Sequence, residues 1–231
     1  MKNIDVIIPI FNEGETLKKI ILELNEKVKA KLNFIICYDY NDEPGLKHLP
    51  SLKNIRTVIN NGKSPNTAIL SGIMNSSSEF ILVYMADDLE NIDLINKFVD
   101  LSDRYDLIIP SRYVEGGKFE NAKFFKKIIA ILGYILLNKI LGLPFKDCTN
   151  AFKFFKRDLL KYIKFESKVG FTYAIELTIK SNYLKKKIIE IPCVWRNLEN
   201  RDGNFKIIKW LPNYLYWAMR AFIFQIKSFF K

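Results

Sequence analysis

Residues 80–90 read Phe-Ile-Leu-Val-Tyr-Met-Ala-Asp-Asp-Leu-Glu, an apolar run that ends abruptly in acidic residues. The first six residues are typical of a buried strand in a parallel sheet. Asp87, Asp88 and Glu90 follow at the carboxyl end of this strand, where open α/β sheets bind their ligands. Carboxylates at such a position suit Mg²⁺ or Mn²⁺, which would bridge to a diphosphate supplied by a substrate.

Strands and helices alternate from the amino terminus onward. We expect strands at about 4–10, 33–38, 54–59, 80–85 and 106–110, with helices at about 16–31, 66–77 and 91–103 between them. This spacing predicts βαβ units and a mostly parallel sheet flanked by helices, which is an α/β fold. Asp88 or Asn91 would then cap the helix at 91–103, and this is the structural alternative to a metal-binding role.

Each expected strand is followed by polar residues. The groups are Asn12 and Glu13, Asp39, Asn61 and Lys63, Asp87 and Asp88, and Ser111 and Arg112. Because the carboxyl ends of parallel strands meet at one edge of a sheet, we expect these groups to form one site.

The chain of 231 residues carries a formal net charge of +11, which predicts an anionic partner. A nucleic acid, a phosphorylated substrate and an anionic membrane surface all fit that charge. The basic residues alternate with aliphatic and aromatic runs instead of forming a separate patch. This pattern disfavours a nucleic-acid-binding surface and favours a membrane interface.

Cysteine usage and the amino terminus indicate a cytosolic setting. Cys37, Cys148 and Cys193 are far apart and lack metal-ligand spacing, so we expect reduced thiols. The chain enters a strand directly, so no signal peptide is expected. It also lacks a run of about 18 uncharged apolar residues, so no confident transmembrane span is expected. His48 is the single histidine, which disfavours a histidine-based catalytic site.

Two later segments, 122–141 and 207–231, are predicted to form helices with wide apolar faces. In 207–231, a stripe of polar residues projects within about 40° on a helical wheel. Basic residues beside aromatic ones suit burial at a lipid interface, with the charges reaching lipid phosphates. Alternatively, 122–141 is a core helix and 207–231 packs on a partner subunit or on a missing domain. The partner would be a second copy of the chain or a membrane protein. The stripe consists of Lys209, Asn213, Arg220, Lys227 and Lys231.

Several motifs resemble those of known enzymes. One set of motifs resembles those of the family 2 glycosyltransferases with the GT-A fold. These motifs are Val6-Ile-Ile-Pro-Ile-Phe-Asn-Glu13, Asp39, Asn61-Gly-Lys63, Met85-Ala-Asp-Asp-Leu-Glu90 and Ser111-Arg-Tyr113. A second set resembles one branch of that family, the dolichol-phosphate mannose synthase-like polyprenyl-phosphate glycosyltransferases. These motifs are Ser111-Arg-Tyr-Val-Glu-Gly-Gly117, Asp147-Cys-Thr-Asn-Ala-Phe152, Glu190-Ile-Pro192 and Arg201-Asp-Gly-Asn-Phe-Lys206. The resemblance covers about residues 4–206. It implies a GT-A domain over 1–206, with a nucleotide-binding half at about 1–112 and an acceptor half at about 113–206. The segment 207–231 would follow as a C-terminal amphipathic helix.

The resemblance implies an inverting hexosyltransferase that uses Mg²⁺ or Mn²⁺. It would move a sugar from a GDP- or UDP-sugar to a polyprenyl phosphate, such as dolichyl or undecaprenyl phosphate. The setting would be the cytoplasmic face of the membrane, in cell-envelope polysaccharide biosynthesis. By position, the donor nucleotide would contact Pro9, Asn12, Glu13, Asp39, Lys63, Asp87 and Asp88, and the metal would lie on Asp87, Asp88 and Glu90. Arg112, Arg201 and Lys206 would hold the acceptor phosphate, and catalysis would depend on Asp88, Arg112 and Asp147.

The chain departs from the family pattern at three positions. Ala86 replaces the first acid of the Asp-x-Asp motif, Asp39-Tyr-Asn-Asp-Glu43 stands in place of the usual Asp-Asp-Gly-Ser-Thr, and Ala151 replaces the Gly of a Thr-Gly-Phe motif. In addition, Glu90 falls where the family often has Gln. Two alternatives to the polyprenyl-phosphate activity therefore stay open. One is transfer to a sugar hydroxyl in surface-polysaccharide assembly, which requires a catalytic base; Asp147 and Glu176 are the carboxylates considered. The other is a non-catalytic nucleotide- or lipid-binding protein.

Overall fold

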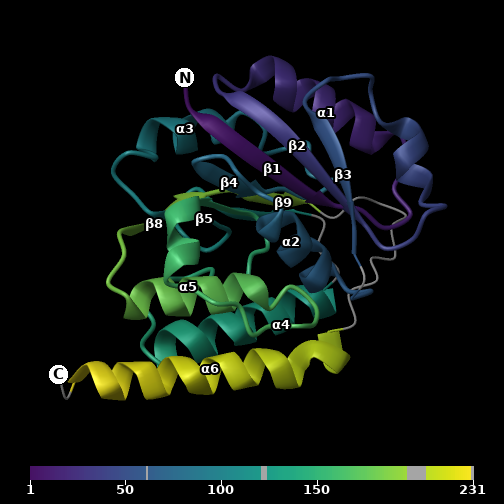
Figure 1. Cartoon of the computed structure of the whole chain (residues 1–231). Coiled ribbons are helices and arrows are strands. Elements are labelled where there is room, and N and C mark those ends of the chain that lie inside the picture. The colour runs from purple at the N-terminus through teal and green to yellow at the C-terminus, as the bar shows by residue number, and fades with distance from the viewer. Residues whose placement is uncertain (61, 121–123, 197–206, 230–231) are drawn as a thin grey trace.

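A computed structural model describes residues 1–60, 62–120, 124–196 and 207–229 (Figure 1). Its centre is a seven-stranded sheet in the order β3-β2-β1-β4-β7-β5-β8. In this sheet β7 pairs antiparallel with β4 and β5, and the other described pairings are parallel. The predicted α/β fold with a mostly parallel sheet is therefore confirmed. The strands are β1 (Asn3–Pro9), β2 (Lys31–Tyr38), β3 (Ile55–Ile59), β4 (Phe80–Val83), β5 (Leu107–Ser111), β7 (Lys153–Lys156) and β8 (Ile188–Pro192).

Helices cover both faces of the sheet (Figure 1). The helices α1 (Thr16–Lys27) and α3 (Leu94–Leu101) pack on one face, and α2 (Pro65–Met74) and α5 (Tyr173–Tyr183) pack on the other. An outer layer beyond α5 contains α4 (Phe124–Tyr134), the π-helical turn η2 (Ile135–Ile140) and the long C-terminal α6 (Ile207–Phe229). Short 3₁₀ turns lie at η1 (Pro44–His48) and η3 (Arg157–Lys161).

The local sequence explains this layering. Successive side chains of a strand point to opposite faces, so Val6 and Ile8 join the core under α1 while Ile7 joins the core under α2. The helix α2 begins sharply because the Ser64 hydroxyl accepts a hydrogen bond from the Thr67 amide, 3.2 Å away. Pro65 occupies its first turn, where a missing amide proton costs nothing.

The structure differs from the expected elements in three places. The strand β7 was not expected, and it inserts between β4 and β5. A short strand β6 (Lys118–Glu120), which was also not expected, pairs with β9 (Val194–Arg196). The expected helix at 122–141 contains both α4 and η2. Because β7 and β8 belong to the predicted acceptor half, both halves contribute strands to one sheet.

Candidate active site

The polar groups that follow β1, β2, β3, β4 and β5 lie at one edge of the sheet. The strands β1 to β4 are mutually parallel, and β5 has the same direction because it is antiparallel to β7, as β4 is. The expectation that these loops share an edge is therefore confirmed. Asn61, Arg201 and Lys206 lie outside the described residues, so their predicted roles remain predictions.

A buried carboxylate organises the loop after β1. The Glu43 side chain is 1% exposed and accepts hydrogen bonds from the backbone amides of Asn12 and Glu13, at 2.9 and 3.0 Å. A third bond comes from the amide of Gly45, at 3.2 Å. Asn12 adopts a left-handed backbone conformation with φ of 57°, which asparagine tolerates better than most residues. Glu43 therefore joins the β1 and β2 loops, a role that its position in the sequence does not reveal.

Asp39, at the end of β2, is held by the neighbouring loop after β3. The side-chain amide of Asn60 donates to the Asp39 carboxylate and to the carbonyl of Ser64. Burial raises the pKa of Asp39 above its ordinary value, while the hydrogen bond from Asn60 opposes the shift. Lys63 is exposed in a left-handed conformation, and its charge also acts on Asp39. Polar groups from two loops thus meet at this corner, and Asn60 is a further residue that the sequence analysis missed.

Asp88 is the centre of a tight turn after β4. Its carboxylate accepts hydrogen bonds from the amides of Glu90 and Asn91, each at 3.1 Å, and from the Asn91 side chain at 2.9 and 2.8 Å. Burial raises the pKa of Asp88 to about 6, against the lowering effect of the bonds from Asn91. The alternative to a metal-binding role, in which Asp88 or Asn91 caps the following helix, is thus partly confirmed, because Asp88 caps this turn. The helix α3 itself begins later, at Leu94.

The three acids after β4 point to different surroundings. Asp87 is exposed, whereas Glu90 forms an ion pair with Arg196, with 2.7 Å between Oε1 and Nη1. Within the described ranges, no group of three or more Asp, Glu, His or Cys side chains could hold a metal ion. The expected cluster of three carboxylates is therefore not assembled. Asp87 and Asp88 still offer adjacent hard oxygen donors, which suit a divalent cation that draws its other ligands from a diphosphate.

Asn91 connects the turn after β4 to the strand β9. Its side chain accepts a hydrogen bond from the Val194 amide at 3.0 Å and donates to the Val194 carbonyl at 2.7 Å. The preceding Cys193 amide donates to the carbonyl of Ser111, at the end of β5. The acidic turn, the end of β5 and the start of β9 are therefore held together by the Asn91 side chain and one main-chain hydrogen bond.

Arg112 and Asp147 form a buried ion pair beside this junction. Asp147 accepts hydrogen bonds from the Arg112 backbone amide, Nε and Nη2, at 2.9, 2.7 and 2.6 Å. The side chain of Arg112 is 12% exposed and that of Asp147 is fully buried. The guanidinium also lies over the ring of Phe119, 4.8 Å from its centroid. Burial alone would raise the pKa of Asp147, but the charge and hydrogen bonds of Arg112 outweigh burial and lower it.

Glu176, the other carboxylate considered as a base, lies inside α5. Its oxygens accept hydrogen bonds from the amides of Glu166 and Ser167, at 2.7 and 2.8 Å. Lys180 donates to it from the next helical turn, at 2.6 Å. The side chain is fully buried, so Glu176 fixes the segment that precedes α5. Neither Asp147 nor Glu176 presents a free carboxylate in this structure.

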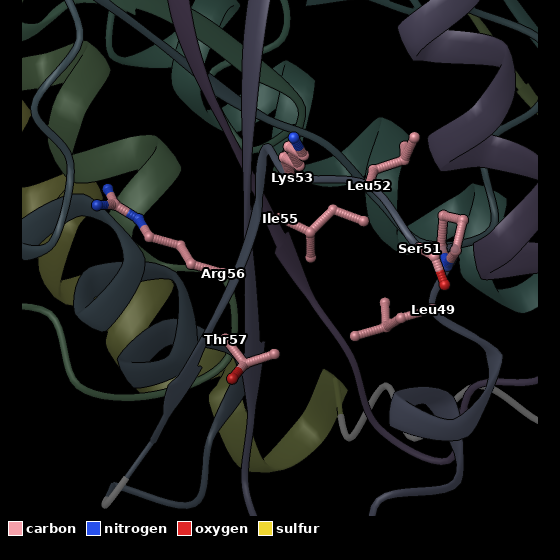
Figure 2. A pocket seen from close by; sticks show the side chains of 8 residues that line it. Leu49, Ser51, Leu52, Lys53, Ile55, Arg56 and Thr57 are labelled. Atoms are coloured by element: carbon pink, nitrogen blue, oxygen red, sulfur yellow. The ribbon is translucent and has the colours of Figure 1, made fainter.

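A separate hollow of about 560 Å³ lies beside the edge strand β3 (Figure 2). Its lining consists of residues 49–53 and 55–57, with Ile55 near its centre in the view. None of the predicted site residues lines this hollow. We therefore locate the candidate site at the carboxyl edge of the sheet and assign no role to the hollow.

Comparisons of the sequence identify relatives. The model of glycosyl transferase family 2 matches residues 5–164. A dolichol-phosphate mannosyltransferase of Pyrococcus furiosus is 29% identical over 202 residues, which cover 82% of this chain and 55% of that protein. An undecaprenyl-phosphate mannosyltransferase of Micrococcus luteus is 31% identical over 131 residues, which cover 55% of this chain and 53% of that protein. The chain thus spans about half the length of these curated relatives.

Solved structures share the fold. Glucosyl-3-phosphoglycerate synthase from Mycobacterium tuberculosis, in complex with Mn²⁺, UDP-glucose and phosphoglyceric acid, matches with a TM-score of 0.67 at 14% identity. The match covers 96% of this chain and 80% of that chain. The same enzyme with UDP gives a TM-score of 0.66. At this identity the similarity shows a GT-A-like fold and nothing further. The family model, however, matches well over half of the chain, so the protein belongs to glycosyl transferase family 2.

Proposed function

We propose that this glycosyltransferase moves a sugar from a GDP- or UDP-sugar to a polyprenyl phosphate at a membrane surface. The observation that carries the proposal is the state of the two candidate bases. Asp147 is paired with Arg112, and Glu176 binds two amides and Lys180. A phosphate nucleophile is already ionised near neutral pH and needs no base, whereas a sugar hydroxyl does. The curated relatives are both named as transferases acting on polyprenyl phosphates.

In this proposal the donor binds across the ends of β1, β2 and β4. Asp39 and the loop held by Glu43 receive the nucleoside, together with Pro9 and Lys63. Asp87 and Asp88 hold a divalent cation; Glu90 joins them when its pairing with Arg196 is broken. When bound, that cation neutralises the charge of the departing nucleoside diphosphate. The chain itself contributes alignment, since the anomeric carbon and the attacking oxygen must meet in a fixed geometry.

Arg112 is proposed to hold the acceptor phosphate. Its described hydrogen bonds to Asp147 use Nε and Nη2, which leaves Nη1 as a donor for a second anion. Guanidinium is suited to this task because its donors are planar and permanently charged. Arg201 and Lys206 are proposed to close over the same phosphate from the segment that follows Arg196.

The outer layer supports membrane binding. Among the described residues, no helix is long and apolar enough to cross a membrane. Instead, α4, η2 and α6 expose a set of large apolar side chains, which we call the apolar face, and a groove of about 310 Å³ lies between η2 and α6. Exposed apolar areas of this extent mark interaction surfaces. The apolar face consists of Ile128, Ile131, Leu132, Ile135, Ile140, Leu211, Leu215, Tyr216, Met219, Phe222, Ile223 and Ile226.

Of the stripe expected on α6, the side chains of Lys227 and Lys231 lie outside the described part of the structure, and the described members differ in direction. Arg220 lies 3.6 Å from Glu166 and over the rings of Trp217 and Phe224, so it contacts the protein. Lys209 is exposed at the start of the helix. Apolar side chains therefore provide most of the proposed membrane contact, and the charges flank it.

The test is a screen of GDP- and UDP-sugars with Mn²⁺ against two acceptors, a polyprenyl phosphate and a lipid-linked sugar with free hydroxyls. We expect transfer to the phosphate, with a rate that is flat across the neutral range, and we expect Glu176→Gln to retain most of the activity. Transfer only to the hydroxyl acceptor, with an acidic limb that Glu176→Gln or Asp147→Asn removes, would contradict the proposal.

A further inference from the structure

Lys153 is a buried lysine in the middle of the sheet. It lies on β7, opposite Val83 of β4, and its side chain is completely buried. Its ammonium group donates to the backbone carbonyl of Asn150 and lies 3.5 Å from that of Asp147. Lysine is almost never fully buried unless it is paired, because removing its charge from water is costly. The described hydrogen bonds of Lys153 are to main-chain oxygens, so its role concerns the segment that carries those oxygens.

That segment is held from two sides. Lys153 binds its carbonyl groups, while the Glu190 carboxylate on β8 accepts hydrogen bonds from the amides of Lys146 and Asp147, each at 2.8 Å. The Asp147 carboxylate in turn accepts three hydrogen bonds from Arg112. The position of the Arg112 guanidinium therefore depends, through Asp147, on groups from two neighbouring strands.

The surroundings of Lys153 form a small charge-balanced cluster. Arg112 and Lys153 carry positive charge, Asp147 and Glu190 carry negative charge, and the other three all act electrostatically on Lys153. Two thiols, Cys148 and Cys193, also face the cluster, and burial raises the pKa of each to about 12, so both stay neutral. From the α5 side, the Tyr173 hydroxyl donates to the carbonyl of Ala151.

Burial lowers the pKa of Lys153 to about 8, although the attraction of Asp147 opposes this shift. Lys153 therefore loses its proton well before a lysine in water, at about 10.4. Once it is neutral, the cluster carries an excess negative charge next to Arg112. The field that Arg112 presents to an anion is then weaker.

We propose that Lys153 is a positioning residue that holds the segment 146–150, and with it Asp147, so that Arg112 is presented to the acceptor phosphate. The proposal rests on the proposed function in one respect, the identity of the anion that Arg112 meets. Lys153 itself lies beneath the ion pair and is not expected to touch the substrate.

The first test does not depend on the acceptor. Amide hydrogen exchange is measured in the full chain for Lys153→Met and for a matched control, Lys156→Met, on the same strand. Lys156 pairs with Asp106 outside the cluster. We expect the amides of Arg112 and Asp147 to exchange at least about tenfold faster in Lys153→Met, as for loss of one charged hydrogen bond, and to be unchanged in the control. Unchanged protection at both amides in Lys153→Met would overturn the proposal.

The second test measures the affinity for farnesyl phosphate, a short polyprenyl phosphate, by calorimetry between about pH 7 and pH 9.5. Because the pH dependence is measured on the wild-type protein, this test remains informative even if Lys153→Met folds poorly. We expect the affinity of the wild type for farnesyl phosphate to fall several-fold as the pH rises past about 8, and the same for Lys156→Met. Lys153→Met is expected to bind farnesyl phosphate weakly at every pH, without this decrease near pH 8. A wild-type affinity that is constant through this range overturns the pH-dependent role of Lys153. Absence of binding by every protein at every pH would instead refute the proposed acceptor, and hydrogen exchange would still decide the positioning role.

Discussion

Replacing Asp147 with asparagine tests the ion pair on which the candidate site depends. The asparagine has one oxygen that can accept from Arg112, and its amide group would face a guanidinium donor where the carboxylate now accepts. Arg112 would keep its charge, which is nearly buried, without a counter-charge. Breaking a buried ion pair on one side costs about 3–5 kcal/mol.

That cost is large relative to the whole fold. Domains are stable by about 5–15 kcal/mol, so Asp147→Asn is expected to remove about a fifth or more of the free energy of unfolding. For a chain of this size, about 1 kcal/mol corresponds to about 2–4 °C, which gives a decrease in Tm of about 6–20 °C. Urea unfolding at neutral pH, followed by circular dichroism, measures the free energy directly.

The control is Asp158→Asn. Asp158 pairs with Lys161 at 2.9 Å, but both side chains are largely exposed, and such pairs contribute about 0–1 kcal/mol. A loss of less than about 1 kcal/mol in Asp147→Asn, similar to that of the control, would refute the reasoning.

The pH dependence gives a second check on the same variant. The pKa of Asp147 is lowered in the folded protein, because Arg112 outweighs the effect of burial. Its stabilisation is therefore complete above the unfolded value of about 3.9 and is lost as the pH falls through the folded value. The difference between wild type and Asp147→Asn should thus be full at pH 7 and shrink below about pH 4.

Three further predictions concern other parts of the molecule. Asp88→Asn is expected to weaken Mn²⁺-dependent binding of a nucleoside diphosphate at least about tenfold with the fold intact; undiminished affinity in calorimetry would exclude a metal role. Leu215→Glu with Met219→Glu, on the apolar face, should release the protein from vesicles containing anionic lipid, whereas Met74→Glu, at an exposed methionine on α2, should not; equal co-sedimentation of all variants would contradict this. Glu43→Gln should cost about 1–3 kcal/mol in urea unfolding, because one oxygen that accepts backbone amides becomes a donor; an unchanged midpoint would show that this carboxylate does not hold the loop.

The sequence alone was sufficient to predict those strands and loops that depend on local patterns of apolar and polar residues. The run at 80–85 and the polar residues after it identified the carboxyl edge, because a buried strand and its end are visible within ten residues of sequence. The strand β7 was missed for a physical reason. Its flanking residues Lys153 and Lys156 suggest an exposed segment, yet Lys153 is completely buried in the sheet. Its place between β4 and β5 depends on contacts with strands more than 40 positions away.

The directions of the acidic side chains could not be read from their positions in the chain. Glu90 was expected to face a metal, but it pairs with Arg196, which is distant in sequence. Asp147 and Glu176 were considered as catalytic bases. In the structure Asp147 accepts hydrogen bonds from Arg112, which is distant in sequence, and Glu176 accepts one from the backbone amide of Glu166. Glu43 offered a weak signal, since an acid before Pro44 commonly starts a short helical turn, but its bonds to the β1 loop follow from topology.

The charges at the carboxyl edge constrain how the reaction proceeds. Asp39, Asp87 and Asp88 place negative charge where the nucleoside diphosphate is proposed to bind, although the chain as a whole carries +11. Without a cation, the donor would approach like charges, which is unfavourable. In the proposed function, a divalent ion at Asp87 and Asp88 would offset this repulsion. Arg112 would meet a second anion that arrives separately, through the Nη1 edge that its described bonds to Asp147 do not use. This division of cationic groups matches a reaction between two anionic substrates better than one between an anion and a neutral sugar.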